Sequence, residues 1–174
     1  MVKKHVSQIG SRSIRARAKP VISINSKTKT TIKNLVETMR ATGLVGMAAS
    51  QIGIDQRIFV TEIRTTATRK KQRDLDQLRI FINPRIIQLS KQQSTDYEGC
   101  GSVAHAQLFG KVSRSRSVVI RAMDEKGKVI TLAADGLLAR VIQHEMDHLN
   151  GKVFLDRMIN TISLIDRQHY LQQS

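Results

Sequence analysis

The chain has 174 residues, of which 40% are hydrophobic, and its 29 Lys and Arg against 14 Asp and Glu give a formal net charge of +15. We therefore predict one globular catalytic domain, residues 1–174, and exclude a membrane span, because no apolar run could cross a bilayer. The single cysteine excludes an internal disulfide and suits a reducing compartment, so we expect a cytoplasmic protein.

The first quarter of the chain predicts a lead-in, a helix and a flexible turn. Residues 1–20 are basic and irregular, and we predict an extended N-terminal segment. Apolar residues spaced i, i+3, i+4 and i+7 then predict a helix from about Thr28 to Thr42. Gly43 is typical of a helix C-terminal cap, and residues 43–53 are mostly small.

The next part of the chain predicts two strands, residues 57–63 and 79–83, with a long basic loop, residues 64–79, between them. Pro84 cannot donate a ladder hydrogen bond, and we expect it to end the second strand, with residues 85–89 continuing extended. Four basic residues cluster in the loop: Arg69, Lys70, Lys71 and Arg73.

The last third of the chain predicts a hairpin, a helix and a terminal helix. Residues 118–123 and 128–132 are typical of two strands joined by a tight turn. Asp135 is expected to cap a helix that Gly151 closes, and a shorter helix is expected at about 159–172. Strands with one helix among them indicate an α+β fold, with mixed or antiparallel sheets packed around the central helix.

That central helix carries an H-E-x-x-H motif, the most informative feature of the chain. On a helix, residues i and i+4 lie on one face, so His144 and His148 can bind one metal ion. Glu145 would then lie beside a water molecule held by that metal. The motif predicts a hydrolytic metal centre.

Two histidines do not complete a catalytic metal site, which needs three protein ligands and an open position. Downstream candidates for the third ligand are Asp156, Asp166 and His169. Cys100 is a fourth candidate, because its two glycine neighbours allow close backbone approach and a thiolate binds divalent metals well. Taken by itself, however, a single cysteine is more often a small buried apolar residue.

Three segments, taken in order, resemble motifs of the peptide deformylase family: VGMAASQ at 45–51, EGCGS at 98–102 and QHEMDHL at 143–149. The likeness runs from about Ile9 to Asp156. Residues 9–21 look like the family's own N-terminal segment, and we therefore expect no transit peptide ahead of them.

The resemblance implies removal of the formyl group from N-formylmethionine at the start of nascent polypeptides. It makes Cys100, His144 and His148 the metal ligands, with Fe²⁺ as the native ion and Zn²⁺, Ni²⁺ or Co²⁺ as substitutes. A metal-bound hydroxide would attack the formyl carbon, with Glu145 as general base and then general acid. The donors to the formyl oxygen would be the Gln51 amide and the backbone N–H of Gly101.

The same resemblance suggests how substrate is held. Gly46 would let the peptide backbone lie close to a strand edge. Val45, Leu137 and Val141 would receive the methionine side chain. We further predict, from sequence position, that Glu98 and Arg114 pair and brace the Cys100 segment.

The chain departs from the family pattern in three places. Leu44 replaces the first glycine of the usual Gly-x-Gly-x-Ala-Ala segment, and Gly101 replaces the leucine after the ligand cysteine. The loop 103–110 lacks the expected proline and is about two residues longer; His105 within it is expected to be a surface residue. We hypothesise that the chemistry survives while substrate affinity or preference differs from that of ordinary members.

Two other functions stay open. A divergent metallohydrolase could act on related amides, and the altered segment after Cys100 keeps this alternative alive. An inactive deformylase-like module could instead bind the ribosome or RNA, although such a module has no physical need for Glu145. The basic charge suits attraction to ribosomal RNA in either case. We expect a monomer that acts away from the membrane.

Overall fold

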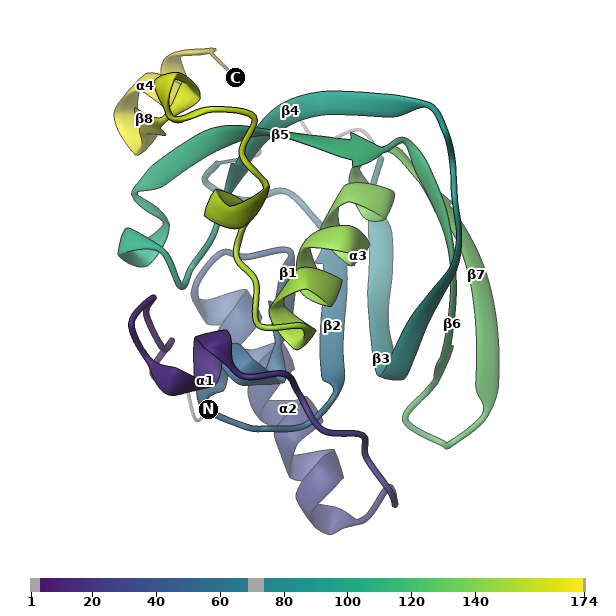
Figure 1. Cartoon of the computed structure of the whole chain (residues 1–174). Helices are drawn as coiled ribbons and strands as arrows, with labels where there is room; N and C mark the ends of the chain where they lie inside the picture. Colours follow the sequence, from purple (N-terminus) through teal and green to yellow (C-terminus); the bar gives the residue numbers. More distant parts are fainter. Residues whose placement is uncertain (1–3, 69–73, 174) are drawn as a thin grey trace.

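The computed structural model describes residues 4–68 and 74–173 (Figure 1). Its helices and strands, in chain order, are α1 (Arg12–Arg15), α2 (Ser26–Ala41), β1 (Gly46–Ala48), β2 (Ile58–Ile63), β3 (Asp76–Leu89), β4 (Gln93–Gly99), β5 (Leu108–Ser115), β6 (Ser117–Met123), β7 (Val129–Asp135), α3 (Gly136–Leu149), β8 (Ile165–Asp166) and α4 (Arg167–Gln173).

The strands form two antiparallel sheets, which confirms the predicted α+β class. The larger sheet has the order β1-β2-β3-β6-β7 and the smaller has the order β4-β5-β8. Strand β1 lies at one edge of the larger sheet and β4 at one edge of the smaller sheet. Each of these two strands therefore has one side without a partner strand among the described residues. These two free edges matter for the site described below.

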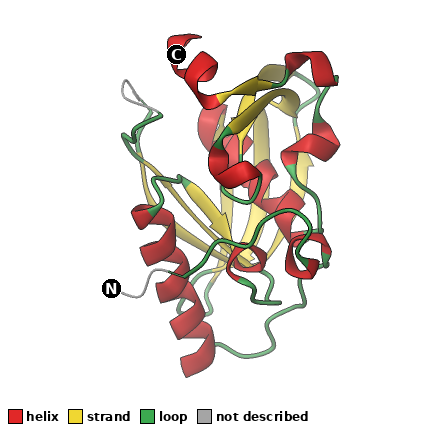
Figure 2. Cartoon of the chain, turned by 90° about the vertical axis from the view of Figure 1, so that its left-hand side faces the viewer, coloured by secondary structure: helices red, strands yellow, loops and turns green. Residues whose placement is uncertain are grey.

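The two longer helices cover opposite faces of the large sheet. Strand β2 alternates between them: Phe59 packs in a core cluster with α3 residues, whereas Ile58 and Val60 pack with α2. Figure 1 shows α3 in front of β1 and β2 with α2 behind them, and Figure 2 shows the same layers from the side. Helix α3 therefore lies centrally, as the sequence predicts.

Helix α2 illustrates how local sequence sets an element. Asn25 precedes it and accepts a hydrogen bond from the Thr28 backbone N–H at 3.1 Å, a typical N-cap. Its buried face includes Leu35 and Met39, and Gly43 follows it in the left-handed region at φ +70°. The predicted helix and its glycine stop are confirmed, with the start two residues earlier than expected.

The prediction that Pro84 ends a strand is wrong, because β3 runs through it from Asp76 to Leu89. The strand accommodates the proline at a register shift between Ile82 and Arg85. Asn83 there has φ +51°, and its side-chain amide exchanges two hydrogen bonds of 2.8 Å with the backbone of Val21. The bulge removes the need for a ladder donor at residue 84.

Other boundaries differ from the predictions. The segment 1–20 is not wholly extended, since it contains α1, and the loop predicted at 64–79 is shorter, since β3 begins at Asp76. The basic cluster Arg69, Lys70, Lys71 and Arg73 lies outside the described residues. The C-terminal helix expected within about 159–172 is present as α4, but it begins only at Arg167, after a short 3-10 turn and β8.

The β4 and β5 strands were not predicted at all. Most of β4 is exposed and polar, so it shows no alternation of apolar residues. The loop predicted at 103–110 ends early, because β5 begins at Leu108. Its central residues Ala104, His105 and Ala106 all have positive φ, between +46° and +60°. His105 is exposed, as expected.

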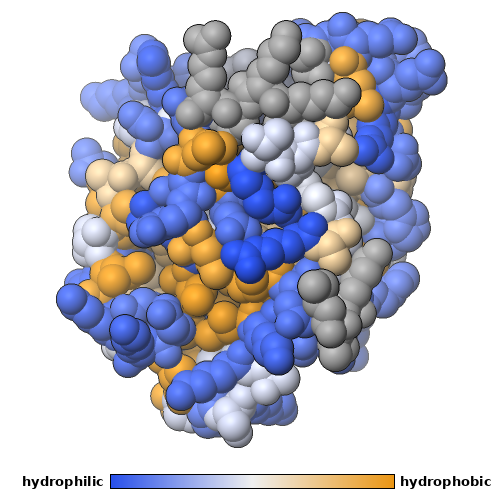
Figure 3. Space-filling model, turned by 180° about the vertical axis from the view of Figure 1, so that it is seen from behind, coloured by the Kyte–Doolittle hydropathy of each residue, from blue (hydrophilic) through white to orange (hydrophobic). Residues whose placement is uncertain are grey.

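No helix in the described ranges is both long and apolar enough to cross a membrane. Seen from behind, the surface mixes hydrophobic and hydrophilic side chains (Figure 3).

Candidate metal centre and substrate cavity

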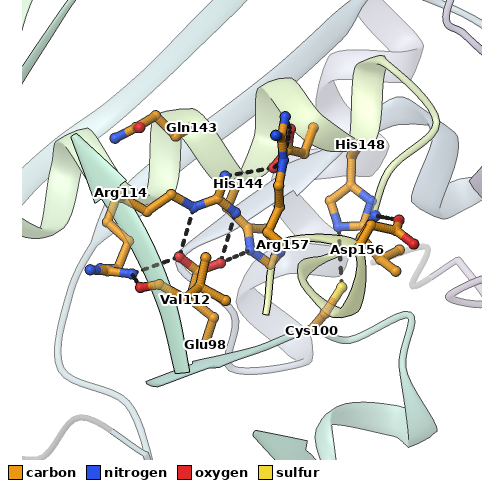
Figure 4. Close-up of polar contacts among 12 residues, drawn as sticks. Glu98, Cys100, Val112, Arg114, Gln143, His144, His148, Asp156 and Arg157 are labelled. Carbon is orange, nitrogen blue, oxygen red and sulfur yellow. Dashed lines mark hydrogen bonds and ion pairs between the residues drawn. The ribbon is translucent and has the colours of Figure 1, made fainter. Parts of the chain in front are cut away.

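Three predicted ligands meet at one point. Helix α3 presents His144 and His148 on one face, with ring centroids 5.0 Å apart. Cys100 directly follows β4, and its Sγ lies 3.1 Å from Nε2 of His148 (Figure 4). One ligand atom from each of the three residues lies within 4.8 Å of the others. Of the four candidates for the third ligand, the Cys100 thiol is the one that lies beside the two histidines.

The other candidates for the third ligand lie elsewhere. Asp156 pairs with Arg15 and accepts a hydrogen bond from the Val153 N–H. Asp166 and His169 pair with each other in the C-terminal segment, at 2.9 Å. All three side chains are engaged with groups outside the Cys100 cluster, and none joins it.

Charge around the cluster favours a thiolate. Burial alone would raise the pKa of the Cys100 thiol, but His148 and His144 lower it well below its ordinary value. The Gln51 amide nitrogen, 3.6 Å from the same sulfur, is a further donor. A soft thiolate beside two imidazoles is a donor set that suits a divalent transition metal with an open fourth position.

A buried ion-pair network fixes the orientation of His144. Burial would raise the pKa of Glu98, but hydrogen bonds from His144 and Arg114 bring it well below its ordinary value. Its carboxylate lies 2.9 Å from His144 Nδ1 and receives two hydrogen bonds from Arg114 and one from Arg140 (Figure 4). The predicted Glu98–Arg114 pair is thereby confirmed.

This network leaves Nε2 of His144 as the nitrogen free to bind a metal, and a carboxylate behind a ligand histidine is the usual support of such a site. His148 presents its Nε2 to Cys100, while its buried Nδ1 has no partner among the described residues. The thiolate, the two imidazoles and the bracing carboxylate together fit a divalent metal ion.

Glu145 is a buried carboxylate next to this cluster. Its Oε2 has no hydrogen-bond partner among the described atoms. Burial raises its pKa to about 7, the histidines opposing and Cys100 adding to the shift. An unpaired buried carboxyl with a pKa near neutrality can both accept and return a proton at physiological pH.

Gly46 of β1 makes this position of Glu145 possible. A Cβ on Gly46 would lie 2.5 Å from Oε1 of Glu145 and 2.7 Å from Cγ1 of Val141. Any larger residue at position 46 would require these side chains to shift.

Of the two polar groups predicted as donors, the Gln51 amide faces the cluster and the Gly101 N–H belongs to the residue next to Cys100. The Gln51 side-chain oxygen accepts a hydrogen bond from the Ala48 N–H at 2.9 Å, which turns the amide nitrogen toward Cys100 and Ser102. The Gly101 N–H donates no hydrogen bond within the part of the chain that the structure describes. Both groups can therefore serve a ligand held beside Cys100.

The cluster opens into a cavity of about 520 Å³. The four residues predicted to bind substrate all line it: Val45, Gly46, Leu137 and Val141. The cavity lining also includes Leu44, one of the departures from the family pattern, and groups that no sequence motif indicated: Tyr97, Arg140, Tyr170 and Leu171.

The C-terminal residues reach the cavity by a long-range pairing. The β8 strand pairs with β5, which places α4 over the cavity, where Tyr170 stacks on Phe109 at a centroid distance of 4.1 Å. The sequence alone gives no signal for this arrangement, because a two-residue strand has no periodicity.

Comparison with known proteins gives a consistent result. A family model described as polypeptide deformylase matches residues 3–163. A peptide deformylase of Treponema pallidum is 38% identical over 150 residues, covering 86% of this chain and 85% of that protein.

Solved structures that resemble this chain are also peptide deformylases. A class I type b peptide deformylase from Acinetobacter baumannii has a TM-score of 0.86 at 27% identity, covering 92% of this chain and all of that one. A Synechococcus elongatus peptide deformylase in complex with actinonin has a TM-score of 0.80 at 33% identity, covering 97% of this chain and 81% of that one.

Proposed function

Because the chain belongs to the polypeptide deformylase family of metal-dependent hydrolases, we propose that it removes the formyl group from N-formylmethionine of nascent polypeptides. The observation that supports this most is the carboxyl of Glu145, with its unpaired buried oxygen, beside the Cys100, His144 and His148 cluster in the wall of a cavity.

The cavity suits an extended peptide. Its lining includes Gly46 of β1 and residues of β4, two strands that each have a free edge among the described residues. A peptide laid between two free strand edges can form main-chain hydrogen bonds with both, the recognition mode called β-augmentation. In this arrangement Val45, Leu137 and Val141 receive the methionine side chain.

A bound Fe²⁺ ion, or Zn²⁺, Ni²⁺ or Co²⁺ in its place, would supply Lewis-acid activation of a water molecule and of the formyl carbonyl. Cys100, His144 and His148 would hold it.

Residues of the chain carry out the proton transfers and stabilise the developing charge. Glu145 takes a proton from the attacking water as the oxygen bonds to the formyl carbon. The Gln51 amide and the Gly101 N–H donate hydrogen bonds to the formyl oxygen as negative charge grows there. Glu145 then gives its proton to the amine nitrogen as the carbon–nitrogen bond breaks, releasing formate and a free N-terminus.

We also propose a ribosome-facing role for part of the basic surface. Arg85 and Arg121 lie directly opposite each other on β3 and β6, and Arg57 and Arg17 both approach Asn150. None of these four arginines forms a salt bridge within the described residues. Neighbouring arginines that are not neutralised by an ion pair attract polyanions, and ribosomal RNA, with its phosphate groups, is a polyanion. We place the protein in the cytoplasm, as a single-domain monomer.

The experiment is a direct assay of the proposed reaction. The protein is purified without oxygen, loaded with Fe²⁺, and given formyl-Met-Ala-Ser or, as a control, acetyl-Met-Ala-Ser, with formate and free amine measured. We expect formate from the formyl peptide and no amine from the acetyl peptide. If the loaded protein releases no formate, the proposal is wrong; if it cleaves both peptides equally, the alternative of a general amide hydrolase replaces it.

A further inference from the structure

Two departures from the family pattern, far apart in sequence, meet in the structure. A Cβ on Gly101 would lie 2.8 Å from Cδ1 of Leu44, closer than real Cβ atoms come to another heavy atom. Both residues line the cavity. In the family pattern that the sequence resembles, glycine stands at the position of Leu44 and leucine at that of Gly101, so this chain has the large and small residues exchanged across one contact.

The backbones on both sides of this contact are fixed. The Leu44 N–H donates to the Met39 oxygen at 3.0 Å, and the Leu44 oxygen accepts a hydrogen bond from Arg64 at 2.9 Å. The Gly101 oxygen accepts one from the side chain of Gln8 at 2.8 Å. With both backbones held by these bonds, a side chain at residue 101 would require the end of the Leu44 side chain to leave its present place.

A volume-conserving exchange of this kind keeps the packing of a site while changing which element supplies the side chain. Here the leucine comes from the segment before β1, and the turn after Cys100 contributes only backbone. Residue 101 then offers its backbone N–H to the formyl oxygen without a side chain of its own beside it.

We propose that Leu44 is a substrate-binding residue that replaces the missing side chain of residue 101 as the apolar wall of the cavity. The inference rests on the proposed function for the identity of the ligand. The proposal requires that substitutions at residues 44 and 101 have interdependent effects on substrate binding.

A double-mutant cycle tests this. The variants are Leu44→Gly, Gly101→Leu and the combined exchange, with Ile162→Gly, which removes a 91% exposed aliphatic side chain, as the control. Binding of the product Met-Ala-Ser is measured by calorimetry, kinetics are measured with formyl-Met-Ala-Ser, and metal content and melting temperature are measured for each variant.

We expect Leu44→Gly to raise KM and weaken Met-Ala-Ser binding roughly tenfold with little change in kcat, because it loses apolar contact and touches no reacting atom. Gly101→Leu should weaken binding by a similar factor, because its side chain and Leu44 compete for one space. The combined exchange should bind within about threefold of the wild type, far better than the product of the single effects.

Single effects that simply multiply in the combined variant would overturn the proposal, as would a Leu44→Gly variant that lowers kcat at unchanged KM. If the four proteins show this coupling in Met-Ala-Ser binding but the wild type releases no formate, the proposed function is refuted and Leu44 remains a binding residue. Equal weakening by Ile162→Gly would show that the effect is not specific to the cavity.

Discussion

Adding one methyl group at Gly46 should disable catalysis without removing the metal site. The new Cβ would lie 2.5 Å from Oε1 of Glu145 and 3.0 Å from its Cδ, whereas comfortable contact needs about 3.5 Å. The carboxylate must therefore shift by about 1 Å. A displacement of that size at a reacting group costs on the order of a hundredfold in rate, or about 2.7 kcal/mol of barrier.

The assay compares Gly46→Ala with the wild type at saturating formyl-Met-Ala-Ser, after equal metal loading. Gly127→Ala is the matched control: it adds the same methyl group at a glycine in the β6–β7 turn, where the nearest atom lies at 3.6 Å, and like other left-handed positions it carries some strain. We expect kcat to fall about a hundredfold in Gly46→Ala alone, with metal content unchanged. A Gly46→Ala variant with wild-type kcat would show that the position of Glu145 does not control the reaction.

Three further predictions concern the support of His144, the C-terminal helix and a partly exposed ion pair away from the cavity. Glu98→Gln removes the anion that orients His144, so metal affinity should fall by roughly 10–100-fold in a chelator competition; unchanged affinity would refute the bracing role. Tyr170→Ala removes the ring stacked on Phe109 and should cost about 0.5–1.5 kcal/mol of stability and raise KM, whereas an unchanged KM would separate α4 from substrate binding. Hydrogen bonding to arginine lowers the pKa of Glu62, so its contribution to stability is present above the ordinary glutamate pKa of about 4.3 and is lost as pH falls through the lowered value. Urea unfolding should therefore show Glu62→Gln less stable than wild type at pH 7, with a difference that shrinks in acid; a constant difference would contradict this.

The parts of the site that could be predicted from sequence are those set by local periodicity. The spacing of His144 and His148 places them on one face of a helix whatever surrounds it, and the structure has an α-helix, α3, at this segment as predicted. Cys100 was different, because the sequence itself left four candidates for the third ligand. The resemblance favoured the thiol, and the structure brings it to the histidines from the end of β4.

What could not be predicted depends on long-range pairing. The strand β4 is polar and mostly exposed, and its place is set by its pairing with β5 rather than by its own pattern. Tyr170 reaches the cavity only because β8 joins the same sheet. Likewise, the two departures Leu44 and Gly101 looked independent in sequence and are in contact in space.

The central claim is that Glu145 transfers protons beside a metal held by Cys100, His144 and His148. The most direct test compares anaerobically purified wild type and Glu145→Ala for bound metal and for turnover of formyl-Met-Ala-Ser. We predict the same metal content in both proteins and a loss of turnover of at least about a hundredfold in the variant, because no other carboxyl with a free buried oxygen is found among the described residues. Equal turnover by the metal-loaded variant would contradict the account.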